Sequence, residues 1–350
     1  MPSLIADDLG DVVALTAPLW DELRGSRIFI TGGTGFFGCW LLESFIWANQ
    51  CLGLKARAVV LTRNPQRLRE QAPCLADDPA VSFHRGDVRD FEFPAGSFSH
   101  VIHAATEASA LLNRTDPSTM LDTNVRGTTR CLEFAATCGA RKFLLTSSGA
   151  VYGPQPSELT HLPETLAGGP DPMSRDSAYA EGKRVAELQC ALAARHGTCE
   201  MKIARGFAFV GPHMQFDAHF AIGNFIRDQA EGQTIVVTGD GTAMRSYLYA
   251  SDLVAWLWTI LFRGENCRAY NVGSEHAVSI AELAAEVARA GQPHVQVEVR
   301  GKPAGLPPQR YVPSTERARR ELGLQERVSL REAISKTLRW YLRSRQAVAS

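Results

Sequence analysis

The sequence lacks an excess of charge of either sign. Lys and Arg total 37, as do Asp and Glu, so the formal net charge is zero. Proteins that bind nucleic acid or an anionic membrane surface through general electrostatics usually carry a basic excess. We therefore expect neither partner, and any phosphate group must be bound by a local arrangement of donors.

Long apolar runs and clustered metal ligands are also missing. No uninterrupted apolar run approaches the roughly 20 residues of a membrane span, and residues 1–27 contain acidic residues without a charged-then-apolar leader. The eight cysteines are scattered, with no Cys-x-x-Cys pair and no Cys/His cluster. We therefore expect a cytoplasmic protein without a metal site or disulfide bonds.

What the sequence does contain is an alternation of short β-branched segments with helical stretches, from residue 27 to about residue 148. Alternation of this kind predicts βαβ units and a parallel sheet covered by helices on both faces. The predicted fold class is α/β, a Rossmann-type doubly wound parallel sheet with a smaller C-terminal α/β lobe. The expected strands are 28–30, 56–62, 81–84, 101–103 and 142–145, and the expected helices are 38–51, 119–138 and 177–196.

Three parts of the chain follow from this pattern. Residues 1–26 form an N-terminal extension with an accessory helix around Val12 to Leu23, and residues 27–200 form the dinucleotide-binding domain. Residues 201–350 mainly form the smaller lobe over the strand ends, with some segments returning to the first domain. In this last part we expect strands at 202–210 and 269–272, helices at 220–231, 251–262, 279–290 and 329–343, and a loop at 301–313.

The most regular motif near the N-terminus is a glycine turn. Gly32, Gly35 and Gly38 come directly after a predicted strand and open a predicted helix, with Phe36 and Phe37 between the last two glycines. The first glycine permits a tight turn, the second lets a pyrophosphate approach the backbone, and the third lets helix and strand pack closely. The helix N-terminus then offers free N–H groups to the phosphates. The motif predicts that NAD or NADP binds here.

The ends of the next two strands carry polar residues that could contact the same cofactor. Arg63 stands where an NAD-selective site usually places a carboxylate, so it could pair with the 2′-phosphate of NADP or be a solvated surface residue. Asp87, followed by Val88, could accept a hydrogen bond from the adenine amine or cap the following turn. Sequence patterns leave both pairs of alternatives open.

The most informative stretch lies later in the chain. Tyr179 and Lys183 are four residues apart in a segment with helical character, so both side chains share one helix face. They follow Ser147 and Ser148, at the end of a predicted strand. Together with the glycine turn, these residues predict hydride and proton transfer on a carbinol.

With these motifs in place, the chain resembles the extended short-chain dehydrogenase/reductase family, in particular its nucleotide-sugar epimerases, dehydratases and 4-keto reductases. The resemblance covers roughly residues 27–340. Besides the glycine turn, the segments that carry it are 103–105, 124–128, 147–153, 179–183, 205–212, 239–245, 249–252 and 270–273.

The resemblance implies roles for the central residues. Tyr179 is expected to act as acid and base on the sugar hydroxyl, with its pKa lowered by the Lys183 ammonium and the oxidised nicotinamide. Lys183 is expected to bond the nicotinamide ribose, and Ser148 to hold the reacting oxygen. The further expected cofactor contacts are Ala104, Ala105, Asn124 and Ser147.

For the nucleotide sugar, the resemblance implies contacts from later segments. Arg245 aligns with the family's diphosphate-binding arginine, and Arg310 is a second candidate cation. Asn224 could reach the phosphates or the base, while Glu107 could bind a sugar hydroxyl or be a solvated loop acid. Ala208 and Ser246 depart from the family's usual Asn and Asp, which leaves the identity of the sugar open.

One departure bears on the reaction. The family's 4,6-dehydratases have Asp-Glu directly after the catalytic Ser or Thr, but here these positions are Gly149 and Ala150. This change disfavours elimination and slightly favours 4-epimerisation. An NADPH-dependent 4-keto reductase, a dehydratase whose acid is Glu107, and a non-enzymatic dinucleotide sensor are the alternatives. By resemblance, helices 119–138 and 177–196 are expected to form a homodimer.

Overall fold

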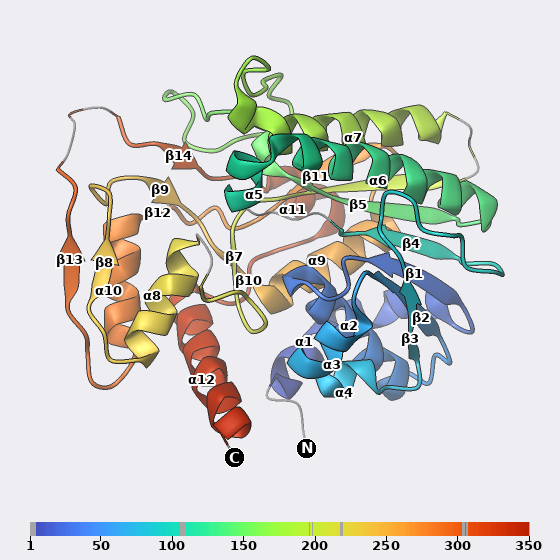
Figure 1. Ribbon diagram of the computed structural model, residues 1–350, viewed down its shortest axis with the longest axis horizontal. Helices are drawn as coiled ribbons and strands as arrows, with labels where there is room; N and C mark the ends of the chain where they lie inside the picture. Colours follow the sequence, from blue (N-terminus) through green and yellow to red (C-terminus); the bar gives the residue numbers. More distant parts are fainter. Residues whose placement is uncertain are drawn as a thin grey trace.

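A parallel seven-stranded sheet forms the centre of the protein (Figure 1). The computed structural model describes residues 5–105, 110–195, 197, 199–217, 220–302, 305 and 307–349. The strand order is β11-β6-β5-β4-β1-β2-β3. All strands are parallel, but the chain adds β2 and β3 on one side of β1 and the later strands on the other side, beginning with β4. In doubly wound sheets, ligands bind at such a reversal, outside the carboxyl ends of the strands. The strands are β1 (Arg27–Thr31), β2 (Arg57–Thr62), β3 (Val81–Arg85), β4 (His100–His103), β5 (Lys142–Ser148), β6 (Glu200–Gly206) and β11 (Arg268–Val272).

Helices cover both faces of this sheet. Figure 1 shows α6 (Pro117–Thr137) and α7 (Ala178–Ala194) on one face, and α1 (Ala6–Thr16), α2 (Phe36–Cys51) and α9 (Ala250–Arg263) on the other. The strand β1 illustrates why both faces are apolar: Ile28 and Ile30 belong to the core beneath α2 and α9, whereas Phe29 belongs to the core beneath α6 and α7. Successive strand side chains point to opposite faces, so a strand buried on both sides is apolar throughout. The predicted α/β fold is confirmed.

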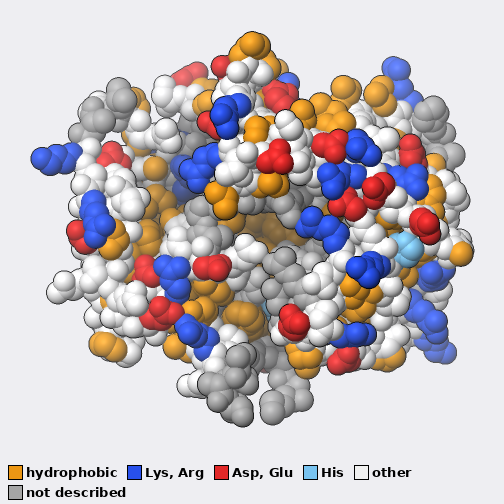
Figure 2. All heavy atoms as spheres, in the orientation of Figure 1, with side chains coloured by type: hydrophobic (Ala, Val, Ile, Leu, Met, Phe, Trp, Pro, Cys, Tyr) orange, Lys and Arg blue, Asp and Glu red, His pale blue; other side chains and the backbone are white. Residues whose placement is uncertain are grey.

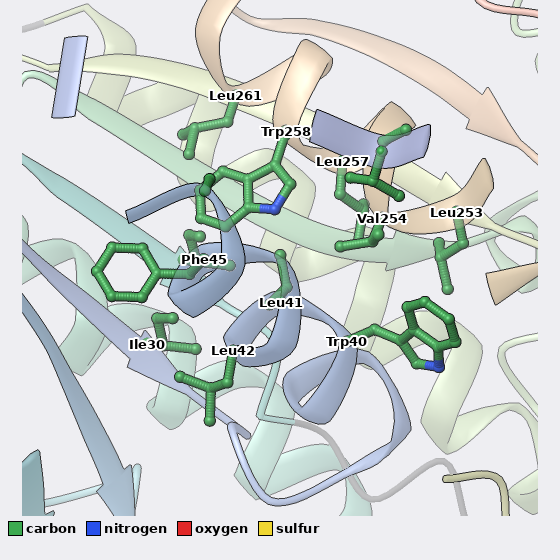
Figure 3. Packing of buried hydrophobic residues seen from close by; sticks show 14 of the residues in the cluster. Ile30, Trp40, Leu41, Leu42, Phe45, Leu253, Val254, Leu257, Trp258 and Leu261 are labelled. Atoms are coloured by element: carbon green, nitrogen blue, oxygen red, sulfur yellow. The ribbon is translucent and has the colours of Figure 1, made fainter. Parts of the chain in front are cut away.

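The larger core joins α2 to α9 (Figure 3). Trp40 and Phe45 of α2 are fully buried, as is Trp258 of α9, whose indole N–H donates to the Ser44 hydroxyl at 2.9 Å. This packing fixes the orientation of α2, and therefore of the glycine turn at its N-terminus. Of the helices described in the structure, none is both long and apolar enough to span a membrane.

The remaining elements form a smaller lobe beside the strand ends, at the left of Figure 1. Its core lies between α8 (Ala221–Ala230), α10 (Ile280–Ala290) and α12 (Leu330–Ala349). Its short strands are β7 (Phe209–Val210) with β10 (Leu248–Tyr249), β8 (Ile235–Val237) with β13 (Val297–Val299), and β9 (Met244–Arg245) between β12 (Val278–Ser279) and β14 (Arg310–Tyr311). The other helical segments are η1 (Ala17–Leu23), α3 (Pro65–Gln71), α4 (Pro73–Ala76), α5 (Ala110–Thr115), η2 (Gly149–Tyr152), η3 (Arg175–Ser177) and α11 (Glu316–Leu322).

Two expected segments differ from the structure. The accessory helix, predicted around Val12 to Leu23, is an α-helix only over Ala6–Thr16 and continues as the 3-10 helix η1. Pro18 lies at the start of η1, where its missing N–H interrupts the helical ladder. The predicted loop 301–313 contains β14, because the Met244 N–H donates to the Gln309 carbonyl at 2.8 Å. That pairing joins residues far apart in sequence, which local patterns do not reveal.

The N-terminal extension connects the sheet to the smaller lobe through a buried carboxylate. Asp8 of α1 is 5% exposed, and it accepts hydrogen bonds from the Tyr249 hydroxyl (2.7 Å) and from Lys336 Nζ of α12 (2.6 Å). Because a buried carboxylate is stable only when paired, α1 is held against both parts of the molecule.

Candidate active site

The glycine turn between β1 and α2 is packed as tightly as the sequence predicts. Gly32 has φ +72°, and a Cβ there would lie 2.4 Å from the Ala104 carbonyl oxygen. A Cβ at Gly38 would lie 2.3 Å from the Gly32 carbonyl oxygen, and one at Gly33 would lie 2.5 Å from a methyl carbon of Val60. Gly33 was not singled out from the sequence, because its contact comes from the neighbouring strand.

Gly35 differs from its neighbours in the turn. A Cβ at Gly35 would meet the Gly32 carbonyl oxygen at 3.5 Å, an ordinary contact, so the protein itself leaves space in front of this residue. Gly35 is also the N-cap of α2, with extended backbone and no side chain to occupy the first N–H groups. A helix N-terminus with free N–H groups and an uncrowded approach fits the pyrophosphate of a dinucleotide. The turn therefore fits the expected cofactor, with the half-buried rings of Phe36 and Phe37 beside it.

The residues after β2 and β3 have local partners. Arg63 is exposed, and its charge helps to hold the pKa of Asp87 below its usual range. The larger cause of the lowered pKa is Arg89. Its guanidinium donates to both carboxylate oxygens of Asp87, at 2.9 and 3.1 Å, and its backbone N–H donates to Asp87 Oδ1 at 3.0 Å. These contacts make Asp87 a cap of its own turn, and Val88 is buried against α6 at Gly127. Any adenine contact of Asp87 remains a prediction.

The structure brings Tyr179, Lys183 and Ser148 together at the carboxyl end of β5. Ser148 is the last residue of β5, and its hydroxyl is near enough to Tyr179, in the first turn of α7, to act against the rise of the Tyr179 pKa. Lys183 is 2% exposed, and its Nζ donates to the Thr146 carbonyl of β5 at 2.7 Å. The start of α7 is held by Asn113 of α5, whose Oδ1 accepts from the Tyr179 N–H at 3.0 Å. The three residues expected to be catalytic therefore lie at one strand end.

The acid–base properties of this cluster differ from the expectation in one respect. Burial raises the pKa of Tyr179, and the hydrogen bond with Ser148 only partly opposes this change, so the expected lowering is not present in the protein alone. Burial lowers the pKa of Lys183 to about 7, and the carboxylate of Glu187 opposes that shift. Tyr179, Lys183 and Glu187 are spaced four residues apart along one face of α7. This spacing could have identified Glu187 from the sequence.

Glu187 also anchors a second network behind the cluster. Its carboxylate accepts from the Arg205 guanidinium at 2.6 and 2.9 Å and from the Ser147 hydroxyl at 2.5 Å. Ser147, an expected cofactor contact, thus directs its hydroxyl to Glu187 rather than toward Ser148 and Tyr179. Any contact of Ser147 with the cofactor remains a prediction.

Asn124 and the two alanines after β4 lie near the cluster and the glycine turn. Asn124 is 2% exposed on α6, and a Cβ at Gly182 would lie 2.8 Å from its Cβ. The Ala104 carbonyl touches Gly32, and the Ala105 N–H donates to the Thr31 hydroxyl at 3.1 Å. Asn124 therefore packs one residue from Lys183, and residues 104–105 form a wall of the glycine turn.

Position 149, which carries an acid in the related dehydratases, has no room for a side chain. A Cβ at Gly149 would lie 2.6 Å from Phe207 Cζ and 2.7 Å from the Tyr311 hydroxyl. Both distances are shorter than Cβ atoms tolerate, so an aspartate here would have to displace two rings. The aromatic pair Phe207–Tyr311, with ring centroids 4.7 Å apart, thus occupies this side of the site.

On the substrate side, strand register separates the two candidate arginines. Arg245 pairs with Tyr311 and Met244 pairs with Arg310 in the parallel β9–β14 ladder. Paired residues point to the same face and successive residues to opposite faces, so Arg245 shares the face of Tyr311 and Arg310 points away from it. Arg245 is therefore the better placed of the two for a substrate phosphate.

The two other expected substrate contacts, Asn224 and Glu107, remain predictions. Asn224 is half-buried on α8, where its Oδ1 accepts from Arg227 at 3.3 Å. Glu107 lies outside the described residues. Figure 2 shows a hollow near the middle of the molecular face, with apolar side chains in its floor and Lys or Arg side chains at its rim.

Comparison with known proteins assigns the chain to a family. A model of the NAD dependent epimerase/dehydratase family matches residues 28–273, which is more than half of the chain. UDP-glucuronic acid decarboxylase 6 of Arabidopsis thaliana is 32% identical over 334 residues, which cover 93% of each chain. UDP-glucuronic acid decarboxylase 3 of the same plant is 33% identical over 310 residues, 88% of this chain and 86% of the relative. The chain belongs to the NAD dependent epimerase/dehydratase family.

Solved structures support the same fold. The UDP-glucose 4-epimerase of Thermotoga maritima, solved with UDP-glucose, superposes with a TM-score of 0.76 at 20% identity, covering 91% of this chain and 99% of its own. The Thermus thermophilus UDP-glucose 4-epimerase, in complex with NAD, gives a TM-score of 0.74 at 24% identity, covering 90% and 98%. The resemblance to the extended short-chain dehydrogenase/reductase group is confirmed, and the family's dependence on NAD confirms the predicted nicotinamide cofactor.

Proposed function

We propose that the protein is an NAD-dependent enzyme that oxidises C4 of a nucleotide-diphosphate hexose and returns the hydride to the same carbon, giving the C4 epimer. The observation that carries this proposal is the meeting of Ser148, Tyr179 and Lys183 at the end of β5, next to the glycine turn. When bound, NAD would supply the hydride acceptor and donor.

The residues of the chain would handle the proton. Ser148 would hold the C4 oxygen beside Tyr179, which takes the hydroxyl proton during oxidation and returns it during reduction. Because burial disfavours the Tyr179 phenolate, a nearby positive charge is needed to stabilise it. Lys183 would provide that charge one helical turn away, and Glu187 keeps Lys183 protonated over a wider pH range than burial alone would permit.

The epimerase assignment is favoured over elimination by the space around Gly149. Removal of water across C5 and C6 would need an acid and a base near these carbons. Phe207 and Tyr311 fill the volume into which a side chain at position 149 would extend, and Ala150 cannot transfer a proton. The site supports hydride removal and return at C4, which gives epimerisation if the 4-keto sugar rotates between the two steps.

A second candidate is decarboxylation of a nucleotide-linked uronic acid, which the 32–33% identical relatives favour. A ketone at C4 is β to the carboxylate at C6, so the C5–C6 bond breaks with release of CO2 and C5 then takes a proton. The hydride returns to C4 afterwards. This reaction would use the same Ser148, Tyr179 and Lys183 for the oxidation.

The test is incubation with UDP-, dTDP-, GDP- and CDP-hexoses and with UDP-glucuronic acid, followed by NMR of the products. Inversion at C4 without net use of NAD(P)H supports the epimerase, and release of CO2 from the uronic acid supports the decarboxylase. Net consumption of NADPH with a 4-keto sugar would instead select the reductase. A product lighter by one water would select the dehydratase.

Tyr179→Phe separates an enzyme from a dinucleotide sensor. We expect the variant to lose turnover while it retains NAD binding, because the phenol transfers the proton but does not hold the pyrophosphate. A wild-type protein that binds NAD but converts no sugar in the panel would contradict the proposed function.

We further propose that the protein forms a homodimer through α6 and α7. The supporting observation is the exposure of two large apolar side chains one turn apart on α7: Leu188 is 58% exposed and Leu192 52%. Leu121 of α6 is 38% exposed. Exposed apolar side chains are frequent at protein–protein interfaces. A monomeric mass in sedimentation equilibrium would contradict this proposal.

A further inference from the structure

The first passage of the chain into the smaller lobe and its first return form one short ladder. β7 follows β6 into the lobe and β10 leads back to α9, and the two strands pair in parallel. Leu248 and its partner Phe209 pack in the core beneath α2 and α9, whereas Tyr249 and its partner Val210 belong to the core of the lobe. The β7–β10 ladder is therefore the junction between the two cores, and it is only two residues long in each strand.

Asp8 of the N-terminal helix α1 binds this junction. Its Oδ2 accepts from the Tyr249 hydroxyl at 2.7 Å, and its Oδ1 accepts from Lys336 Nζ of α12 at 2.6 Å. Asp8 is 5% exposed and Tyr249 is fully buried, so water is largely excluded from both bonds. One carboxylate thus connects the junction to the last helix of the lobe.

α12 has a second attachment to the sheet side of the molecule. Asp252, in the first turn of α9, accepts from the backbone N–H groups of Arg327 and Val328 at 2.9 and 3.1 Å, just before α12 begins. A helix that is attached at one point can still rotate about it, whereas two attachments fix its direction. Lys336 supplies the second point, so Asp8 fixes the direction of α12 and of the lobe core that packs on it.

The orientation of the lobe matters for the proposed substrate site. Arg245, the better placed cation for a substrate phosphate, belongs to the lobe and precedes Leu248 of the junction by three residues. Ser148, Tyr179 and Lys183 lie at the end of β5 and at the start of α7, which the sheet carries. A nucleotide sugar has to reach both places, with its diphosphate at one and its hexose at the other. The glycine turn, by contrast, belongs wholly to the sheet side.

We propose that Asp8 is a positioning residue: through Tyr249 and Lys336, it holds the smaller lobe in the orientation that binds the nucleoside diphosphate of the substrate. The nature of the ligand rests on the proposed function, whereas the attachment of the lobe rests on the contacts of Asp8 alone. A lobe that is already held in place binds its ligand more tightly, because binding does not have to order it.

Glu22, in the same N-terminal extension, provides a matched control. Its carboxylate accepts from Lys142 Nζ at 2.8 Å and pairs with His100 Nε2 at 3.0 Å. Lys142 and His100 are the first residues of β5 and β4, at the opposite end of the sheet from the glycine turn. Glu22→Ala therefore breaks comparable contacts of the extension while the contacts of Asp8 stay in place. A loss of stability that both variants share is thereby separated from an effect on the lobe.

The first experiment follows the junction and needs no ligand. The Leu248 N–H donates to the Ala208 carbonyl at 3.0 Å across the junction, so hydrogen exchange at this amide reports how often the ladder opens. Asp8→Ala should speed this exchange about tenfold relative to Glu22→Ala, the equivalent of one hydrogen bond. Equal exchange in the two variants would overturn the proposal.

A second variant tests whether Asp8 acts through Tyr249 without emptying a buried site. Tyr249→Phe keeps the buried ring and removes only the hydroxyl that donates to Asp8. It should speed exchange at Leu248 to a similar extent, and it should add nothing in an Asp8→Ala background. Full additivity of the two substitutions would show that the Asp8–Tyr249 bond does not hold the junction.

The last experiment compares two affinities by isothermal titration, with NAD and with UDP, dTDP, GDP and CDP in turn. Asp8→Ala should weaken binding of the nucleoside diphosphate that the wild-type protein prefers by about tenfold and leave NAD binding unchanged. Glu22→Ala should change neither affinity. Equal weakening of both ligands, or of neither, would overturn the role of Asp8 in substrate binding. A wild-type protein that binds none of the four diphosphates would count against the proposed function, while exchange at Leu248 would still decide whether Asp8 holds the lobe.

Discussion

The buried amine of Lys183 should lower the free energy of unfolding relative to a variant with an apolar side chain at this position. Burial lowers the pKa of Lys183 from 10.5 to about 7, which means that the folded protein disfavours the ammonium relative to the unfolded chain. One pKa unit corresponds to about 1.4 kcal/mol, so the full shift corresponds to about 5 kcal/mol of destabilisation. Lys183→Met removes this penalty and loses the hydrogen bond to Thr146, worth about 1 kcal/mol. We expect a net gain of about 2–4 kcal/mol at pH 7 with loss of activity.

The pH dependence gives this prediction its sign. A base with a lowered pKa binds more protons in the unfolded chain between about pH 7 and pH 10.5, so wild-type stability rises with pH across that window through this group. The variant lacks this rise, and its advantage should therefore shrink from pH 7 toward pH 10. Comparing the two proteins at each pH cancels the titration of the other groups.

The assay is urea unfolding of wild type, Lys183→Met and a control, Lys202→Met, at three pH values. Lys202 is also 2% exposed, but it pairs with Glu200 and donates to the Gly264 carbonyl. Removing Lys202 breaks an ion pair, so this control should be less stable than wild type. Loss of stability in Lys183→Met at every pH, or an advantage that does not change with pH, would refute the reasoning.

The other predictions concern proton transfer and the glycines. Tyr179→Phe should lower kcat by about 10²–10⁴-fold while isothermal titration still detects NAD binding; turnover near the wild-type rate would contradict its role. Gly149→Asp should cost about 1–3 kcal/mol of stability in thermal melts and yield no dehydrated product by mass spectrometry. The control is Gly239→Ala, whose Cβ would meet no described atom within 4 Å, and its stability should differ from that of wild type by less than about 0.5 kcal/mol. Gly35→Ala should weaken NAD binding without loss of stability, while Gly38→Ala should lower the melting temperature as well, since its Cβ would lie 2.3 Å from backbone; equal melting temperatures would contradict this difference.

The elements of the sheet were predictable because their signals are local. β1, β2, β4 and β5 contain the apolar residues that the sequence places in strands, and the glycine turn follows β1 as its spacing predicts. The shared helix face of Tyr179 and Lys183 was also predictable from their i, i+4 spacing, and the position of Ser148 at a strand end from the strand pattern. The rise of the Tyr179 pKa in the protein alone was not predictable, because the degree of burial depends on segments packed from elsewhere in the chain.

The smaller lobe shows what local patterns leave out. β9, β12 and β14 are two residues long, and each exists only because a distant segment supplies its hydrogen-bond partners. The separation of Arg245 from Arg310 depends on that register, which neither residue's neighbours in sequence reveal.

By itself the sequence determined the doubly wound sheet, the dinucleotide turn and the Tyr179–Lys183 pair, because each is encoded by periodicity or spacing within a few residues. Only the tertiary structure decided that Phe207 and Tyr311 fill the volume in front of Gly149, and that Glu187 faces Lys183 and Arg205 together. Contacts between distant segments arise from the packing of the whole chain, so they become visible only when the fold is known.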